Sequence, residues 1–173
     1  MYRSFVFLLC FFLSLVSIDS FTQVNRHEIH FNRNGTHLIK NYSREEYNAS
    51  PQNWAIVQDP RGVIYIGNEG KVLEYDGKNW RSIPNENGSL VRSLGVDSEG
   101  TVYVGGEGEF GYLKPDKTGN LNYVVLSSDI ESTFKEVWKT YTREDTVYFC
   151  TPNMIFQYKK DSLLNIIETT HWH

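Results

Sequence analysis

The sequence predicts an all-β protein built from repeated four-stranded antiparallel units. The first supporting observation is a motif written twice, Asp-x-x-Gly-x-x-Tyr-x-Gly, whose copies begin at Asp59 and Asp97, an offset of 38 residues. The second is that β-branched and aromatic residues, which favour strands, flank each turn. A period near 40 residues is typical of β-propeller blades, so we expect about three blades of an incomplete propeller. The equivalent positions are Asp59, Gly62, Tyr65, Gly67 and Gly70, then Asp97, Gly100, Tyr103, Gly105 and Gly108, with Tyr148 in a third unit.

The first blade is predicted over residues 54–84. Its Asp-x-x-Gly is expected to form a turn, because an Asp side chain accepts bonds from nearby backbone N–H groups and Gly adopts positive φ. Asp76-Gly77 is a second hairpin signal. The four strands are expected at Trp54–Val57, Val63–Ile66, Val72–Tyr75 and Trp80–Ile83.

The second blade, 90–126, is expected to repeat these strands 38 residues further on. The third, 134–173, is degenerate. We expect its first strand at Phe134–Tyr141 and a turn at Thr142–Asp145 that lacks the glycine. The remaining strands are expected at Thr146–Phe149, Met154–Tyr158 and Leu163–Ile167.

Residues 1–22 have the features of a secretory signal peptide. Arg3 supplies a positive charge and an apolar run extends from Phe5 to Ile18. Small side chains favour cleavage after Thr22 or near Ser20. An uncleaved membrane anchor is the alternative, although the run is shorter than the roughly 20 residues of a spanning helix. Residues 23–53 are predicted to be a polar leader segment, and we expect an exported, periplasmic protein.

The composition narrows the functional classes. A net charge of −4 and a pI near 5.7 argue against nucleic-acid binding by this chain. Cleavage near Thr22 would remove Cys10 and leave Cys150 alone, so no internal disulfide is expected. Cys150 ends an apolar strand, and we interpret it as a buried small hydrophobe.

No catalytic, cofactor or metal site is predicted. The glycines of 106–111 fit G-x-G-x-x-G, but Pro115 excludes the helix that a dinucleotide site requires, so a hairpin is expected. Nothing in the sequence fixes a separation between the loop carboxylates of a glycosidase-like pair. The histidines show no metal-ligand spacing. No catalytic role is therefore expected for Glu107, Glu109 and Asp116, and no metal-binding role for His27, His30, His37, His171 and His173.

Three tryptophans, Trp54, Trp80 and Trp138, are candidates for stacking on a sugar. Trp80 lies beside the Gly77-Lys78-Asn79 turn, and we expect it to pack between two blades. No ligand is selected by any of these side chains, so the ligand-binding residues are left unassigned.

The repeated Asp-x-x-Gly-x-x-Tyr-x-Gly with its Leu-x-Tyr-Asp-Gly hairpin resembles the two-component regulator propeller repeat, in which Trp is the usual aromatic residue. Residues 42–160 are similar to the N-terminus of large sensor regulators of Bacteroidota. The resemblance implies an exported propeller followed by further blades, a triple-tyrosine domain, a membrane helix and a histidine kinase or helix-turn-helix DNA-binding output. We therefore expect a piece of a longer sensor, or a truncated gene product.

The leading hypothesis is a ligand-sensing propeller segment of a signal-transduction protein, with a glycan or another small molecule as the ligand. The alternatives are an extracellular propeller enzyme acting on glycans and a structural protein-interaction propeller. Three blades cannot close a ring, so the last blade is expected to expose an apolar face and a strand edge. Self-association through that edge is a further prediction.

Overall fold

The computed structural model describes residues 39–130 and 133–169. The predicted signal peptide, the 23–38 part of the leader and His171–His173 lie outside the described residues. The chain from Asn41 onward belongs to one compact unit. Within the described stretches, no helix is long and apolar enough to span a bilayer.

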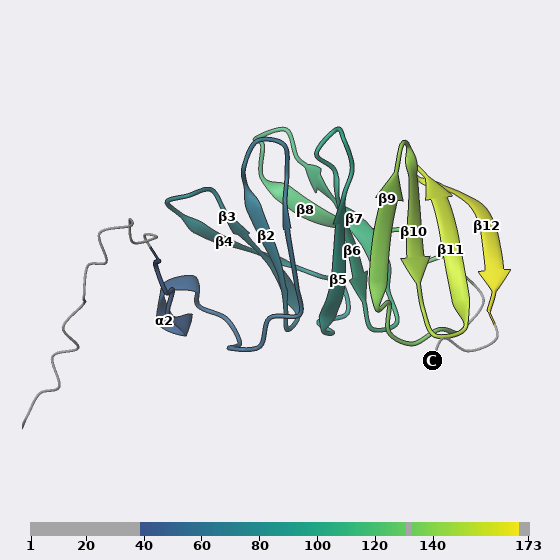
Figure 1. The fold of residues 1–173 in the computed structure, drawn as a ribbon, viewed down its shortest axis with the longest axis horizontal. Coiled ribbons are helices and arrows are strands. Elements are labelled where there is room, and N and C mark those ends of the chain that lie inside the picture. Colours follow the sequence, from purple (N-terminus) through teal and green to yellow (C-terminus); the bar gives the residue numbers. More distant parts are fainter. Residues whose placement is uncertain (1–38, 131–132, 170–173) are drawn as a thin grey trace, which may run out of the picture. The chain divides into compact units, whose positions relative to one another are not determined.

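Three four-stranded antiparallel sheets follow one another along the chain, which confirms the predicted all-β fold (Figure 1). In each sheet the four strands lie side by side in sequence order. We call the first strand of each sheet its inner strand and the last its outer strand. Blade one contains β1 (Ala55–Gln58), β2 (Ile64–Asn68), β3 (Lys71–Tyr75) and β4 (Trp80–Pro84). Blade two contains β5 (Val91–Val96), β6 (Val102–Gly106), β7 (Phe110–Pro115) and β8 (Leu121–Val125). Blade three contains β9 (Lys139–Arg143), β10 (Thr146–Cys150), β11 (Met154–Lys159) and β12 (Ser162–Glu168).

The blades pack face to face, and two apolar clusters lie between them. We call the face of a blade that meets the next blade in chain order its forward face, and the opposite one its backward face. Tyr65 and Val72 on the forward face of blade one are buried against Val91 and Val104 of blade two. The second cluster lies between blades two and three and contains Tyr103, Phe110, Val137, Val147, Phe149, Phe156 and Tyr158.

The start of blade three differs from the prediction. Residues 134–138 do not form the expected strand, and the strand begins at Lys139. Phe134 packs its ring against Phe110 and Phe156, with ring centroids 5.3 and 5.1 Å apart, and Val137 is fully buried. Val137 is therefore buried between the two blades and Phe134 is half-buried, whereas Trp138 stays exposed. The segment adds only an isolated bridge from Glu136 to Glu107 instead of a strand.

The turn of blade three is also shorter than predicted. Thr142 and Arg143 belong to β9, and Arg143 pairs directly with Thr146. Only Glu144 and Asp145 remain in the turn, and Glu144 takes the left-handed conformation with φ 55°. The positive φ of this turn is therefore taken by a non-glycine residue, whereas in the other blades it is taken by Gly62 and Gly100.

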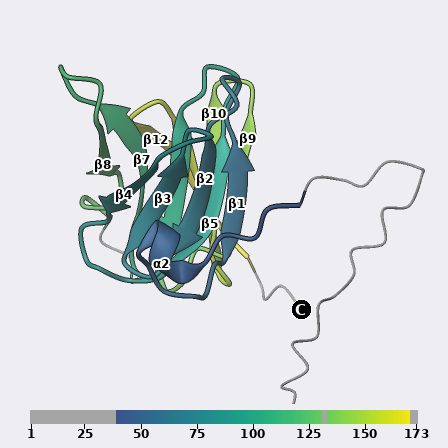
Figure 2. The same cartoon turned by 90° about the vertical axis from the view of Figure 1, so that its left-hand side faces the viewer.

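The end of the leader forms a cap that the sequence analysis treated as a polar linker. Helix α2 (Arg44–Tyr47) follows Ser43, whose backbone N–H donates to the Glu46 carboxylate at 2.8 Å. Tyr42 and Tyr47 pack on Trp80, with centroids 5.3 and 5.6 Å away. Strand pairing places Trp80 and Tyr75 on the backward face of blade one, and Figure 2 shows α2 in front of that face.

Candidate functional site

Asp59 organises the first turn of blade one. Its fully buried carboxylate accepts hydrogen bonds from the backbone N–H groups of Arg61 and Val63 at 2.9 and 3.1 Å. The Arg61 guanidinium donates at 2.7 Å and the Tyr65 hydroxyl at 3.3 Å. Burial acts to raise the pKa of Asp59, but the bonds from Arg61 and Val63 outweigh it and hold the pKa below its usual value. The turn thus fixes an ionised carboxylate beneath Tyr65.

Asp97 makes the equivalent turn in blade two. It accepts from the backbone N–H groups of Glu99 and Thr101 at 3.0 and 2.8 Å and from the Tyr103 hydroxyl at 3.2 Å. Burial, reinforced by the Asp97 carboxylate, raises the pKa of Tyr103 above its usual value. Gly62 and Gly100 both have φ 89°, which confirms that the conserved spacing is a turn signal. The tyrosine of the motif is therefore the hydrogen-bond partner of its aspartate.

The last glycine of each motif copy permits close approach of the next blade. A Cβ atom at Gly67 would lie 2.9 Å from Val91 Cγ1, and one at Gly105 would lie 2.6 Å from Val137 Cγ1. Real Cβ atoms do not approach so closely, so each glycine leaves space that a valine of the following blade enters. At Gly105 this space is shared with the Ser93 hydroxyl of blade two itself, which would lie closer still to the Cβ atom. Gly70 and Gly108 lie in the turns between the second and third strands, with φ 69° and 75°.

Tyr148 aligns with Tyr65 and Tyr103 but has a different environment. Its forward face meets no further blade among the described residues, and no described residue accepts a hydrogen bond from its hydroxyl. It is half-buried, whereas Tyr65 is fully buried. Equivalence in the sequence repeat therefore does not give Tyr148 the structural role of the other two tyrosines.

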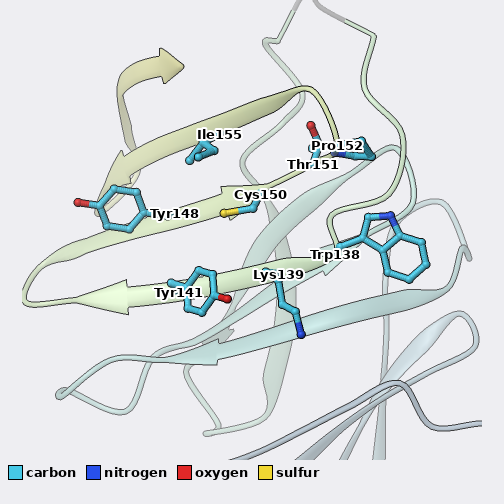
Figure 3. A pocket seen from close by; sticks show the side chains of 8 residues that line it. All are labelled: Trp138, Lys139, Tyr141, Tyr148, Cys150, Thr151, Pro152 and Ile155. Carbon is cyan, nitrogen blue, oxygen red and sulfur yellow. The ribbon is translucent and has the colours of Figure 1, made fainter. Parts of the chain in front are cut away.

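A cavity of about 610 Å³ opens on the forward face of blade three (Figure 3). Side chains from neighbouring strands β9, β10 and β11 form its floor, and the residues before β9 and after β10 close one end. The cavity is lined by Trp138, Lys139, Tyr141, Tyr148, Cys150, Thr151, Pro152 and Ile155. Apart from Trp138, the sequence analysis did not single out these residues as candidate ligand contacts.

Cys150 corrects one expectation. The thiol is unpaired, as expected, but the residue is half-buried and lines the cavity instead of filling a core. Burial raises the pKa of the Cys150 thiol, so the reactive thiolate is disfavoured. Cys150 therefore belongs to the forward face of blade three and not to an apolar core.

The Arg92 guanidinium lies between the rings of Trp54 and Trp138, near the starts of the first strands of the three blades. We call these three side chains the ladder. The Arg92 guanidinium carbon lies 4.0 Å from the ring centre of Trp54 and 4.9 Å from that of Trp138. These distances are within the range of cation–π contacts. Trp138 remains 45% exposed and also lines the cavity. Trp80, in contrast, stacks on Tyr75 of its own blade at 4.5 Å, under the leader cap. It therefore packs, but against the leader and not between two blades as predicted.

The carboxylates considered for catalysis lie in separate surroundings. Asp116 accepts bonds from the backbone N–H groups of Thr118 and Asn120 in its own turn. Glu109 is 5% exposed, and burial raises its pKa. Glu107 and Glu109 flank Gly108 in the β6–β7 connection, which confirms the hairpin predicted for 106–111. In the described part of the chain, no group of three or more His, Cys, Asp or Glu side chains could hold a metal ion.

Two further grooves lie between blades at the end that carries the Asp turns. The groove between blades two and three, about 310 Å³, gathers five carboxylates with Lys160 and the rings of Tyr103 and Tyr112. Its acidic residues are Asp97, Glu99, Glu144, Asp145 and Asp161. The groove between blades one and two, about 510 Å³, mixes acidic side chains with Arg61 and Arg81.

Comparison with solved structures supports the fold. The crystal structure of the WD40 β-propeller domain of Doa1 superposes with a TM-score of 0.54 at 16% sequence identity, over 71% of this chain. The chain spans 42% of the length of that domain. No protein-family model matches the sequence, and no curated protein matches it. The likeness at this identity concerns the propeller fold.

Proposed function

We propose that this chain is the exported, ligand-sensing part of a two-component-type regulator, within a longer propeller. The propeller fold, the repeated motif and the resemblance of residues 42–160 to sensor regulators support the proposal. Its partners would be the remaining blades and the triple-tyrosine domain of the longer chain. A stop codon directly after His173 in the gene would contradict this part of the proposal, and an in-frame continuation into further blades would support it.

The single observation that carries the ligand-binding role is the ladder of Trp54, Arg92 and Trp138. It places an exposed indole and a cation at one end of the inner strands. Aromatic faces combined with few polar groups are typical of small-molecule sites. We propose a glycan fragment as the ligand, stacked on the part of Trp138 that a following blade would leave uncovered.

Isothermal titration of the chain against neutral and acidic oligosaccharides tests this site. We expect Trp138→Ala to weaken binding about ten-fold or more, a change of about 1.4 kcal/mol. Leu164→Ala is the matched control, because Leu164 is 52% exposed on β12, away from the ladder. Absence of binding across a broad panel, or equal affinities of both variants, would contradict the site.

Export is tested separately by mass spectrometry of protein recovered from the periplasm. We propose that the mature chain begins near Phe21–Val24 because the apolar run ends just before it. An intact Met1 on periplasmic protein would contradict cleavage.

A protein-interaction propeller is the second candidate, favoured by the exposed forward face of blade three. This role predicts partner binding with no response to small molecules. We propose no enzymatic activity, and release of sugars from the same oligosaccharides by the purified chain would overturn that statement. In that event Glu99 and Asp161 of the acidic groove would be the first residues to replace.

A further inference from the structure

The forward faces of the three blades occupy equivalent positions, so they can be compared residue by residue. Strand pairing aligns Ala55, Ser93 and Lys139 as the inner-strand partners of Gly67, Gly105 and Cys150. It also aligns Val57, Gly95 and Tyr141 as the partners of the three motif tyrosines. Apart from the motif tyrosines, which are the same in all three, blade three carries the largest side chain at each of these positions.

The first two forward faces are docking surfaces for the next blade. Val91, the first residue of β5, projects into the hole at Gly67. Val137, two residues before β9, projects into the hole at Gly105. Gly95 lies under the next blade too, since a Cβ there would be 3.0 Å from Thr140 Cγ2. Ser93 Oγ donates to the Val137 carbonyl at 2.7 Å, which adds a polar bond to this contact.

The hole is absent from blade three. Cys150 places a Cβ atom and a thiol where Gly67 and Gly105 leave space, in the inner half of the sheet. Tyr141 is 58% exposed and on the inner edge, so its side chain can turn aside when a partner docks. The Cβ atom of Cys150 is fixed by the backbone of β10 and cannot move in this way.

We infer that the forward face of blade three docks a further propeller blade that differs from blades two and three. This blade presents Gly, Ala or Ser where those blades present Val91 and Val137. The face continues a surface that is covered by a blade in both earlier repeats, which identifies the occupant as a blade. The inference rests on the blade architecture and does not depend on ligand sensing.

A second copy of the chain is a poor occupant in a head-to-tail arrangement. It would have to present the backward face of its blade one, and the leader cap lies on that face. The Tyr42 hydroxyl donates to the Tyr75 hydroxyl at 2.7 Å, and Tyr42 also contacts the Trp80 ring. Docking would require this cap to be displaced.

The test joins a copy of residues 85–126, blade two with its connecting loop, to the C-terminus of the full chain. Four chains are compared, with Val91 of the appended copy either kept or replaced by Ala, and with Cys150 either kept or changed by Cys150→Gly. Docking is measured by amide hydrogen exchange in β10, and by the rate at which a disulfide reagent labels Cys150 where it is present. The unextended chain provides the reference rates.

On the native Cys150 face, we expect the appended blade with Val91→Ala to slow β10 exchange and thiol labelling about ten-fold or more, and the blade with Val91 to leave both unchanged. On the Cys150→Gly face, the blade with Val91 should protect β10 at least as well as the Val91→Ala blade. Equal protection of the native face by both blades would overturn the inference that the docking blade must carry a small residue in place of this valine. Protection in none of the four chains would show that no blade docks there, and concentration-dependent protection of the unextended chain would assign the face to a second copy.

Discussion

Blades two and three share one strand ladder but end in opposite ways. The forward face of blade two is closed: Tyr103 and Phe110 are buried beneath blade three. The forward face of blade three is open, and Tyr141 and Tyr148 line a cavity on it. The two faces also differ in a few side chains, above all Gly105 against Cys150. Backbone topology alone therefore does not decide whether a blade is ready for an identical neighbour.

The largest expected effect comes from filling the hole in blade two. We expect Gly105→Val to lower the free energy of unfolding by about 3 kcal/mol, since the new side chain would overlap Val137 and Thr140. Cys150→Val, at the equivalent position of blade three, should change it by less than about 0.5 kcal/mol, as for an ordinary surface substitution. Urea unfolding measures both. Similar losses for the two variants would show that blade three is closed in solution.

We expect the turn of blade two to contribute more to the free energy of unfolding than the turn of blade three. Asp97→Ala leaves two backbone N–H groups and the buried Tyr103 hydroxyl without their acceptor, so we expect a loss of about 2–3 kcal/mol. Asp145→Ala removes an exposed ion pair with Lys159 and an exposed hydrogen bond from the Thr146 hydroxyl, and should cost less than about 1 kcal/mol. Thermal unfolding of the two variants gives the comparison, and a larger loss for Asp145→Ala would reverse it.

The buried tyrosines predict a loss of stability at alkaline pH. Burial, with the Asp59 and Glu74 carboxylates, raises the pKa of Tyr65 to about 12, against about 10 in an unfolded chain. Because the folded state holds the proton more tightly, this stabilisation is complete below about pH 10. It is lost as pH rises to about 12, a change on the order of 2 kcal/mol.

Stability measured from pH 9 to 12 should therefore fall less steeply in Tyr65→Phe than in the native chain. A slope that Tyr65→Phe leaves unchanged would contradict the raised pKa of this tyrosine.

The smallest effect concerns the strained turn of blade three. Glu144 has φ 55°, so Glu144→Gly should raise the free energy of unfolding by about 0.5–1 kcal/mol. Glu99→Gly is the matched change in the turn of blade two, where φ is not positive, and it should give no gain. Chemical denaturation resolves the difference, and a gain from Glu99→Gly alone would count against this explanation.

The repeat predicted the blades well because its signals are local. The Asp59 and Asp97 turns and their flanking strands were placed to within about two residues, since turn geometry and strand composition are both written in short stretches. The prediction failed at 134–138. Phe134 and Val137 look like strand residues, but their burial is satisfied by contacts with residues distant in the sequence, such as Phe110 and Gly105.

Two other features of the structure, helix α2 and the cavity, could not be predicted from the repeated motif. The Ser43-x-x-Glu46 spacing is a capping-box signal that predicts a helix start, and it could have revealed α2. The cavity could not be predicted, because the pairing of Lys139 with Cys150 depends on a turn one residue shorter than the motif suggests. Register, and not residue type, brings the cavity residues together.

The leader cap has a consequence for the order in which the chain is made. Residues 42–47 leave the ribosome before blade one, so the cap is available as soon as Tyr75 and Trp80 emerge. Each later blade then appears next to a finished forward face, and domains generally fold from the N-terminus during synthesis. Growth of the array is thus directional, with each new blade meeting the forward face of the blade made before it.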